Sequence, residues 1–250
     1  KNIAGVKICL AQTTGNLMMN RVDVLEKLFA LNKLFIVHAE DQRMIEVREK
    51  RFKNAVEPRI HSLIRTPQAA LEAAKKVLPI AKKHNTRLHL THISTKLEVE
   101  ELAKFKSKRI TADCTPHHLY FTDAAYESLG NFAMMNPPLR TDEDRAALWE
   151  ALAVGVIDAI ATDHAPHTKK EKMQNYWKAP AGVPGVETML PLLLDSVNNG
   201  EMSLEDVAAF TAENPARILG LKSKGKIKVG MDADLVIIDM NKRQKVGAKG

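Results

Sequence analysis

The sequence has few cysteines and few aromatic residues, and it has no long apolar run. Cys9 and Cys114 are its 2 cysteines, too few for a disulfide framework, which favours a reducing, cytoplasmic compartment. No apolar run approaches the ~20 residues that a membrane-spanning helix needs, and the first residues lack the apolar core of a signal peptide. We therefore expect neither a secreted nor a membrane protein. With aromatic residues at only 5%, the core must consist mainly of Ala, Leu, Val and Ile.

The charge pattern also argues against a nucleic-acid-binding protein. The net charge is +7, but the lysines and arginines are mixed with acids along helical stretches, and no basic block has interleaved aromatic residues. A solvated outer surface explains this pattern best, and it is compatible with a weak attraction for anionic small molecules. The apolar content of 45% and the charged content of 27% are those of an ordinary globular protein.

Apolar, β-branched runs alternate with helical patterns along most of the chain. The runs predict strands at residues 6–10, 34–38, 87–93, 109–114 and 156–162, and the clearest helical patterns cover residues 66–83, 95–105 and 141–154. This alternation predicts an α/β fold with a parallel sheet, either open or closed into a barrel. After residue 217 the pattern changes, and two short strands are predicted at residues 224–230 and 233–238 around a glycine-containing turn.

Four of the predicted strands end in side chains that can bind a metal. These strand ends carry His38, His92, the pair His117 and His118, and Asp163. A single histidine at a strand end is more often a hydrogen-bonded structural residue, but four such ends are difficult to obtain by chance. Because active sites of parallel α/β folds lie at the carboxyl ends of the strands, the pattern indicates a site for Zn²⁺ or a similar divalent metal.

Two histidine pairs need to be separated. His89 and His92 are three residues apart in one predicted strand, so their side chains should point to opposite faces, and His92 is nearer the strand end. We therefore expect His92 in the site and His89 in a structural role. His117 and His118 are adjacent, so at most one of them is expected to point inward.

Lys7 interrupts an otherwise apolar strand, and two interpretations remain open. It is either a lysine at a sheet edge or in a buried ion pair, or a lysine whose amine has taken up CO₂. The resulting carbamate would bridge two metal ions through its two oxygens.

Taken together, these segments resemble the dihydroorotases of the amidohydrolase superfamily. Similar segments occur in the family's order over nearly the whole chain, at residues 6–8, 37–41, 91–96, 115–119, 135–140, 162–167, 182–188 and 214–217. The most specific is Asp163-His164-Ala165-Pro166-His167, because the related allantoinases and hydantoinases usually differ there and at Asn136.

The resemblance implies a distorted TIM (β/α)₈ barrel with a binuclear zinc centre. It implies these roles: Lys7 as an N6-carboxylated bridging lysine, His38 and His92 as ligands of one metal, Asp163 as a ligand of the other metal and a proton shuttle, and Asn136 and His167 as substrate contacts. It also implies that the loop at residues 180–187 lies over the substrate and that His164 is a supporting group.

The sequence departs from the family pattern in one large respect. The family's metal centre also needs a His-x-His segment on the first barrel strand, and no His-x-His occurs in these 250 residues. We therefore expect a fragment that covers barrel strands four to eight in residues 1–222 and part of a small C-terminal β domain in residues 223–250. A partial gene, a trimmed chain or a split enzyme would each give this result.

For the complete enzyme, the resemblance implies reversible cyclisation of N-carbamoyl-L-aspartate to L-dihydroorotate, a step of pyrimidine biosynthesis, with a homo-oligomer or a complex with aspartate transcarbamoylase as its assembly. A competing interpretation is a non-catalytic dihydroorotase-like subunit that serves as a scaffold for aspartate transcarbamoylase. The missing His-x-His favours the scaffold, whereas the four ligand-type residues favour the enzyme. A hydantoinase-type enzyme is a third interpretation, which residues 163–167 disfavour. An upstream reading frame that encodes the His-x-His segment would separate enzyme from scaffold.

Overall fold

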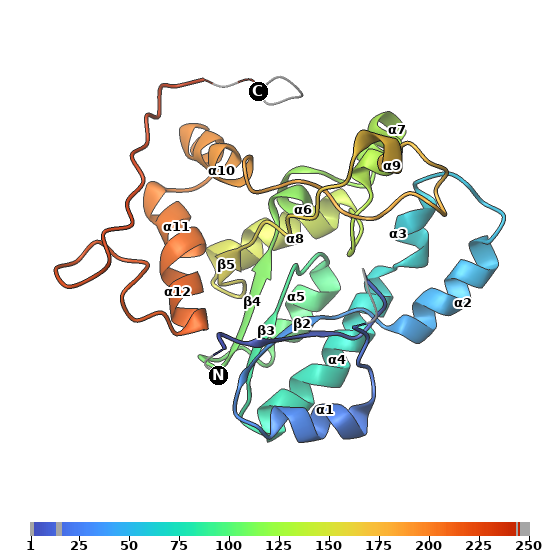
Figure 1. Cartoon of the computed structure of the whole chain (residues 1–250), viewed down its shortest axis with the longest axis horizontal. Helices are drawn as coiled ribbons and strands as arrows, with labels where there is room; N and C mark the ends of the chain where they lie inside the picture. Colours follow the sequence, from blue (N-terminus) through green and yellow to red (C-terminus); the bar gives the residue numbers. More distant parts are fainter. Residues whose placement is uncertain (1–2, 14–16, 244, 246–250) are drawn as a thin grey trace.

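Five parallel strands form one sheet, and their order in space is their order in the chain. The structure, a computed structural model, describes residues 3–13, 17–243 and 245. Each strand pairs with the next in parallel register, and helices connect them (Figure 1). The strands are β1 (Val6–Cys9), β2 (Leu34–His38), β3 (Arg87–Leu90), β4 (Ile110–Cys114) and β5 (Ala159–Ile160). The predicted α/β class with a parallel sheet is confirmed.

The helices begin where the sequence offers caps. The hydroxyl groups of Thr66, Thr95 and Thr141 each accept a hydrogen bond from the backbone N–H three residues later, which satisfies a donor that the first helical turn leaves free. The helices are α1 (Val22–Phe29), α2 (Gln42–Phe52), α3 (Ile60–Ile64), α4 (Pro67–Lys83), α5 (Lys96–Ala103), α6 (Pro116–Tyr120), α7 (Ala125–Leu129), α8 (Asp142–Ala153), α9 (Lys169–Lys172), α10 (Met189–Asn198), α11 (Leu204–Ala208) and α12 (Asn214–Leu219), with a 3₁₀ turn η1 (Gly130–Ala133) and a π turn η2 (Ala209–Glu213).

The two faces of the sheet differ in polarity because side chains alternate along each strand. One face carries apolar residues such as Ile8, Val37 and Leu90, which are buried against the helices in the main core. On the opposite face the register aligns Lys7, Ile36, His89 and Thr111 in one row across β1 to β4. The next row toward the carboxyl ends of the strands contains Cys9 and His38. The polar side chains of the chain's strands therefore gather on the face away from the helices.

The predicted strands are partly too long. The strand predicted at residues 87–93 ends at Leu90, and the one predicted at 156–162 is reduced to Ala159 and Ile160. His92 and Asp163 lie just beyond these ends, with positive φ angles of 46° and 43°. The chain therefore turns sharply after the strands, and the argument that His89 and His92 point to opposite faces is wrong, because they do not share a strand.

The two short strands predicted near the end of the chain are also wrong. Within residues 220–243 the structure contains no strand, and Figure 1 shows this segment running along the outside of the molecule beside α11 and α12. Its apolar residues are exposed, with Val229 and Ile237 at 101% and 99%. Alternating apolar residues form a strand only where a neighbouring strand supplies hydrogen-bond partners, and the described residues supply none here.

None of the helices in the described residues has both the length and the apolar character that crossing a bilayer requires.

Candidate active site at the carboxyl ends of the strands

His38 and His92 meet at the carboxyl ends of β2 and β3. The Nδ1 atom of His38 lies 2.9 Å from the Nε2 atom of His92, and both residues are buried. The Nε2–H of His38 donates to the carboxylate of Glu40 at 2.8 Å. Since a neutral imidazole carries one N–H, this bond leaves the Nδ1 lone pair of His38 directed toward His92.

A buried charge network holds Glu40 behind His38. Glu40 has no exposed surface, and its carboxylate pairs with Arg65. Burial alone would raise the pKa of Glu40, but the positive charge of Arg65 and the hydrogen bond from His38 hold that pKa well below its usual range. Glu40 is therefore ionised, and its carboxylate fixes the orientation of the His38 ring.

Asp113 on β4 holds His92 in its unusual backbone conformation. One carboxylate oxygen accepts the backbone N–H of His92 at 2.6 Å and the hydroxyl of Thr91 at 3.2 Å. The other oxygen lies 2.7 Å from Nε2 of His89. Left-handed φ angles are unfavourable for residues other than glycine, so this buried carboxylate stabilises the turn that directs His92 to His38.

Lys7 and Asp163 belong to the same electrostatic group. Both are exposed in this chain, yet the neighbouring strand ends partly desolvate them. This desolvation lowers the pKa of Lys7, although the negative charges of Cys9, Asp113 and Asp163 act to raise it. Desolvation likewise raises the pKa of Asp163, although the positive charges of Lys7 and His38 act to lower it. His92 in turn interacts with Lys7 and His38, while burial places its pKa well below the usual value.

Asn136 and His167 lie on segments that a single loop joins. The Oδ1 atom of Asn136 accepts from Nε2 of the buried His61 at 2.9 Å. The loop contacts the segment of His167 at Gly182, where an added Cβ would lie 2.5 Å from the carbonyl oxygen of Ala165 and 3.0 Å from Nε2 of His167. Only glycine fits there, and it also adopts the φ of 152°.

His164 holds the same loop through two hydrogen bonds. Its Nδ1 atom accepts the backbone N–H groups of Gly185 at 3.1 Å and Val186 at 3.2 Å. The backbone of Ala165 also donates to Val183 at 2.9 Å. The loop at residues 180–187 therefore packs on the segment that begins with Asp163.

The residues present fit part of a metal centre. Two nitrogens that bind one tetrahedral Zn²⁺ at about 2.0–2.1 Å are separated by about 3.3 Å, and the two imidazole nitrogens of His38 and His92 are 2.9 Å apart. Within the described part of the chain, however, no three His, Cys, Asp or Glu side chains gather closely enough to hold a metal ion. A complete ligand set requires further residues.

Several residues of this region were not singled out from the sequence. No role is predicted from the sequence for Glu40, Asp113, His61 or Lys172. The alternation of Thr111 and Asp113 with apolar residues in β4 was a usable signal, because it matches the alternation around Lys7. No comparable pattern in the sequence marks His61.

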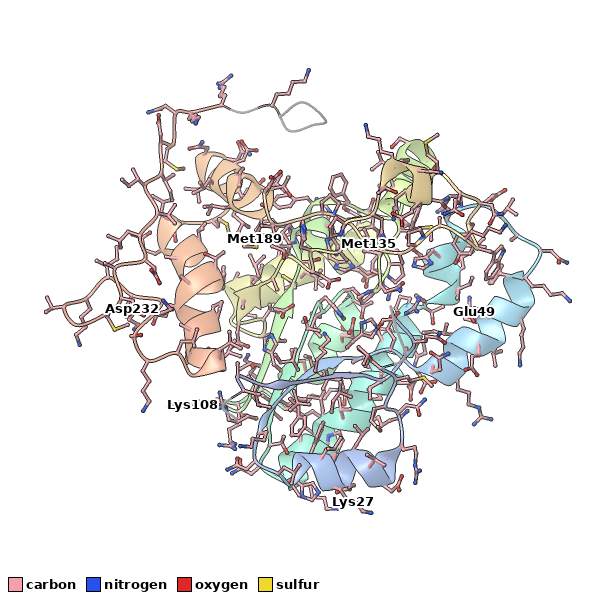
Figure 2. The ribbon with its side chains drawn as sticks, viewed as in Figure 1. Lys27, Glu49, Lys108, Met135, Met189 and Asp232 are labelled. Carbon is pink, nitrogen blue, oxygen red and sulfur yellow. The ribbon has the colours of Figure 1, made fainter. Side chains whose placement is uncertain are left out.

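Met135, whose carbonyl oxygen accepts from His61 at 3.0 Å, lies at the opposite end of the sheet from Lys108 (Figure 2).

Comparisons with known proteins agree with this geometry. Residues 22–248 match the model of the amidohydrolase family. The dihydroorotase of Halobacterium salinarum is 40% identical over 243 residues, which are 96% of this chain and 56% of that protein. The dihydroorotase of Elusimicrobium minutum is 43% identical over 175 residues, 69% of this chain and 40% of that protein. The chain thus spans about half the length of the curated relatives it matches.

A solved structure supports the fold. The L-hydantoinase (dihydropyrimidinase) from Arthrobacter aurescens superposes with a TM-score of 0.90 at 29% identity, over 98% of this chain and 58% of that one. The sheet and its helices therefore form part of a barrel of the TIM type, as the strand order and the polar inner face indicate.

Proposed function

Because the chain belongs to the amidohydrolase family, we propose that it forms part of a dihydroorotase, an enzyme that reversibly cyclises N-carbamoyl-L-aspartate to L-dihydroorotate in pyrimidine biosynthesis. The observation that carries the proposal is the pairing of His38 with His92 at 2.9 Å, each backed by a buried carboxylate. The dihydroorotases at 40% and 43% identity support the choice of reaction.

The proposed metals are zinc, in a binuclear centre. His38 and His92 would hold one metal, Asp163 the other, and a carboxylated Lys7 would bridge them. Such metals polarise a carbonyl group and lower the pKa of water toward ~7. The lowered pKa of Lys7 favours the bridging role, because only the neutral amine reacts with CO₂.

The remaining roles belong to side chains of this chain. In the hydrolytic direction Asp163 accepts a proton from the attacking water and returns it to the ring nitrogen as the carbon–nitrogen bond breaks. A raised pKa suits Asp163 for both steps. Asn136 and His167 bind the substrate, whose carboxylate His167 contacts beneath the loop at residues 180–187.

The wider assignments extend the same proposal. Residues 1–222 belong to the barrel and residues 223–250 to part of a small β domain, in which the described residues up to 243 form no strand by themselves. The activity is placed in the cytoplasm, with a homo-oligomer or an aspartate transcarbamoylase complex as the assembly. A non-catalytic scaffold remains the competing function, because the described residues bring only His38 and His92 into direct ligand contact.

A hydantoinase is the second candidate enzyme, and the superposition with the Arthrobacter aurescens protein favours it. The experiment compares turnover of L-dihydroorotate, hydantoin and dihydrouracil by the metal-loaded, full-length protein that carries this chain. We expect dihydroorotate to be the preferred substrate by kcat/KM. A preference for hydantoin would replace the proposal, and absence of all three activities with normal folding would support the scaffold.

A further inference from the structure

Lys172 is a buried lysine whose ammonium group faces backbone carbonyls alone. It lies at the end of α9 and is 4% exposed. Its Nζ atom donates to the carbonyl oxygens of Met134, Pro180 and Gly182, each at 3.0 Å. Among the described residues no carboxylate pairs with it, and burial lowers its pKa to about 8.

The three carbonyl groups belong to the two segments that surround the proposed substrate. Met134 precedes Asn136 by two residues, and the backbone N–H of Gly182 donates to the carbonyl oxygen of Met134 at 2.8 Å. Gly182 is also the residue that packs on His167. A shift of any of these carbonyl groups would therefore move either Asn136 or the cover of His167.

The ammonium group suits this task because it carries three donors and no acceptor. Three hydrogen bonds satisfy all three donors, and bonds from a charged donor are stronger than those between neutral groups. The acceptors lie in segments without helix or strand, so no regular ladder fixes their spacing. The ammonium group of Lys172 instead holds the three carbonyl oxygens together through its hydrogen bonds.

We propose that Lys172 is a positioning residue for substrate binding, which joins the segment of Asn136 to the loop at residues 180–187 and so fixes the substrate side of the site. This inference rests on the proposed function. Lys172 touches neither the proposed metal ligands nor Asp163 in any hydrogen bond of the structure, so its effect should fall on binding and not on the proton transfer.

The kinetic test uses Lys172→Met in the full-length enzyme, with Lys170→Met as the matched control. Lys170 lies on the same helix and is exposed. Methionine is unbranched, keeps most of the length of the lysine side chain and donates no hydrogen bond, so we expect KM for dihydroorotate to rise about tenfold or more, with kcat and metal content close to wild type. Lys172→Arg, which keeps the charge, should recover part of the loss. An unchanged KM, or a loss confined to kcat, would overturn the proposal.

A structural test keeps the inference separate from the assigned reaction. If the wild-type protein turns over none of the three substrates, the proposed function fails, but the loop contact can still be measured. We expect limited proteolysis to cleave residues 180–187 faster in Lys172→Met than in Lys170→Met, with equal unfolding midpoints for the two variants. Equal cleavage rates would contradict the positioning role. If Lys172→Met does not fold, the same comparison is made with Lys172→Arg.

Discussion

His38 and His92 are 54 positions apart in the sequence, yet their imidazole nitrogens lie 2.9 Å from each other. The contact depends on two different backbone conformations. His38 ends a regular strand, whereas His92 reaches it only through a left-handed residue that Asp113 stabilises. The contact between the two histidines therefore depends on the carboxylate of Asp113 as well as on the histidines themselves.

Asp113→Ala should weaken metal binding in the full-length protein by about 10–100-fold, the usual effect of losing a residue that orients a ligand. The substitution leaves the backbone N–H of His92 and the Nε2 atom of His89 without their partner. A competition titration with a chelator measures the effect, and Glu205→Ala, at an exposed carboxylate, is the control. Equal metal affinity in both variants would show that the turn at His92 holds without Asp113.

Asp163→Asn should leave the fold nearly intact and lower kcat by at least ~10²-fold, because the amide cannot accept the proton that general base catalysis requires. Asp163 is exposed and its side chain makes no hydrogen bond that the helices or strands depend on. Steady-state kinetics and metal analysis test this together. A variant that keeps more than about a tenth of the wild-type kcat would show that Asp163 is not the proton shuttle.

His167→Asn should instead raise KM while kcat and metal content stay close to wild type, because His167 is assigned to the substrate and not to a metal. The half-buried ring packs against Gly182, so an unfolding curve is needed to confirm that the loop at residues 180–187 remains in place. Loss of metal from this variant would contradict the assignment.

Acid should destabilise the fold through His61. Burial, together with the charge of Arg65, lowers the pKa of His61 to about 4 from 6.5. Between these values the unfolded chain binds a proton that the folded chain does not, so the free energy of unfolding falls as the pH falls. From pH 7.5 to pH 5 the loss is about 2 kcal/mol.

Urea denaturation at both pH values measures this loss, and His61→Gln is the matched variant. Its stability should depend less on pH, although His118, whose pKa burial also lowers to about 4, keeps part of the slope. Parallel pH profiles for wild type and variant would refute the assignment to His61.

The 250-residue chain by itself should show no dihydroorotase turnover after metal loading. The described residues offer one close histidine pair and no cluster of three ligands, and incomplete sites bind metals weakly. Among the residues that the structure describes, the outer edge of β1 has a single bridge, to Met18, so we also expect association between chains. Turnover like that of a complete enzyme, from a monodisperse monomer, would contradict both expectations.

The sequence was sufficient to predict the five strands of the sheet, two of them too long, and the strand ends that carry His38, His92 and Asp163, because an apolar run followed by a polar residue is a local signal. It was not sufficient for the path after the strands, since the left-handed turn at His92 depends on Asp113, a partner from another strand. Lys172 lies in a run of lysines and looks like a surface residue. Its burial arises only when residues 134 and 180–182 fold around it.

The agreement of strand order with chain order has a consequence for synthesis on the ribosome. No strand of the sheet is inserted between two earlier ones, so β1 can pair with β2 as soon as β2 has emerged, and each later strand adds to an existing edge. Chains are made at about 5–20 residues per second and fold from the amino-terminal side. The growing sheet therefore never needs to open to admit a strand, because each new strand pairs at the edge that the preceding strand exposes.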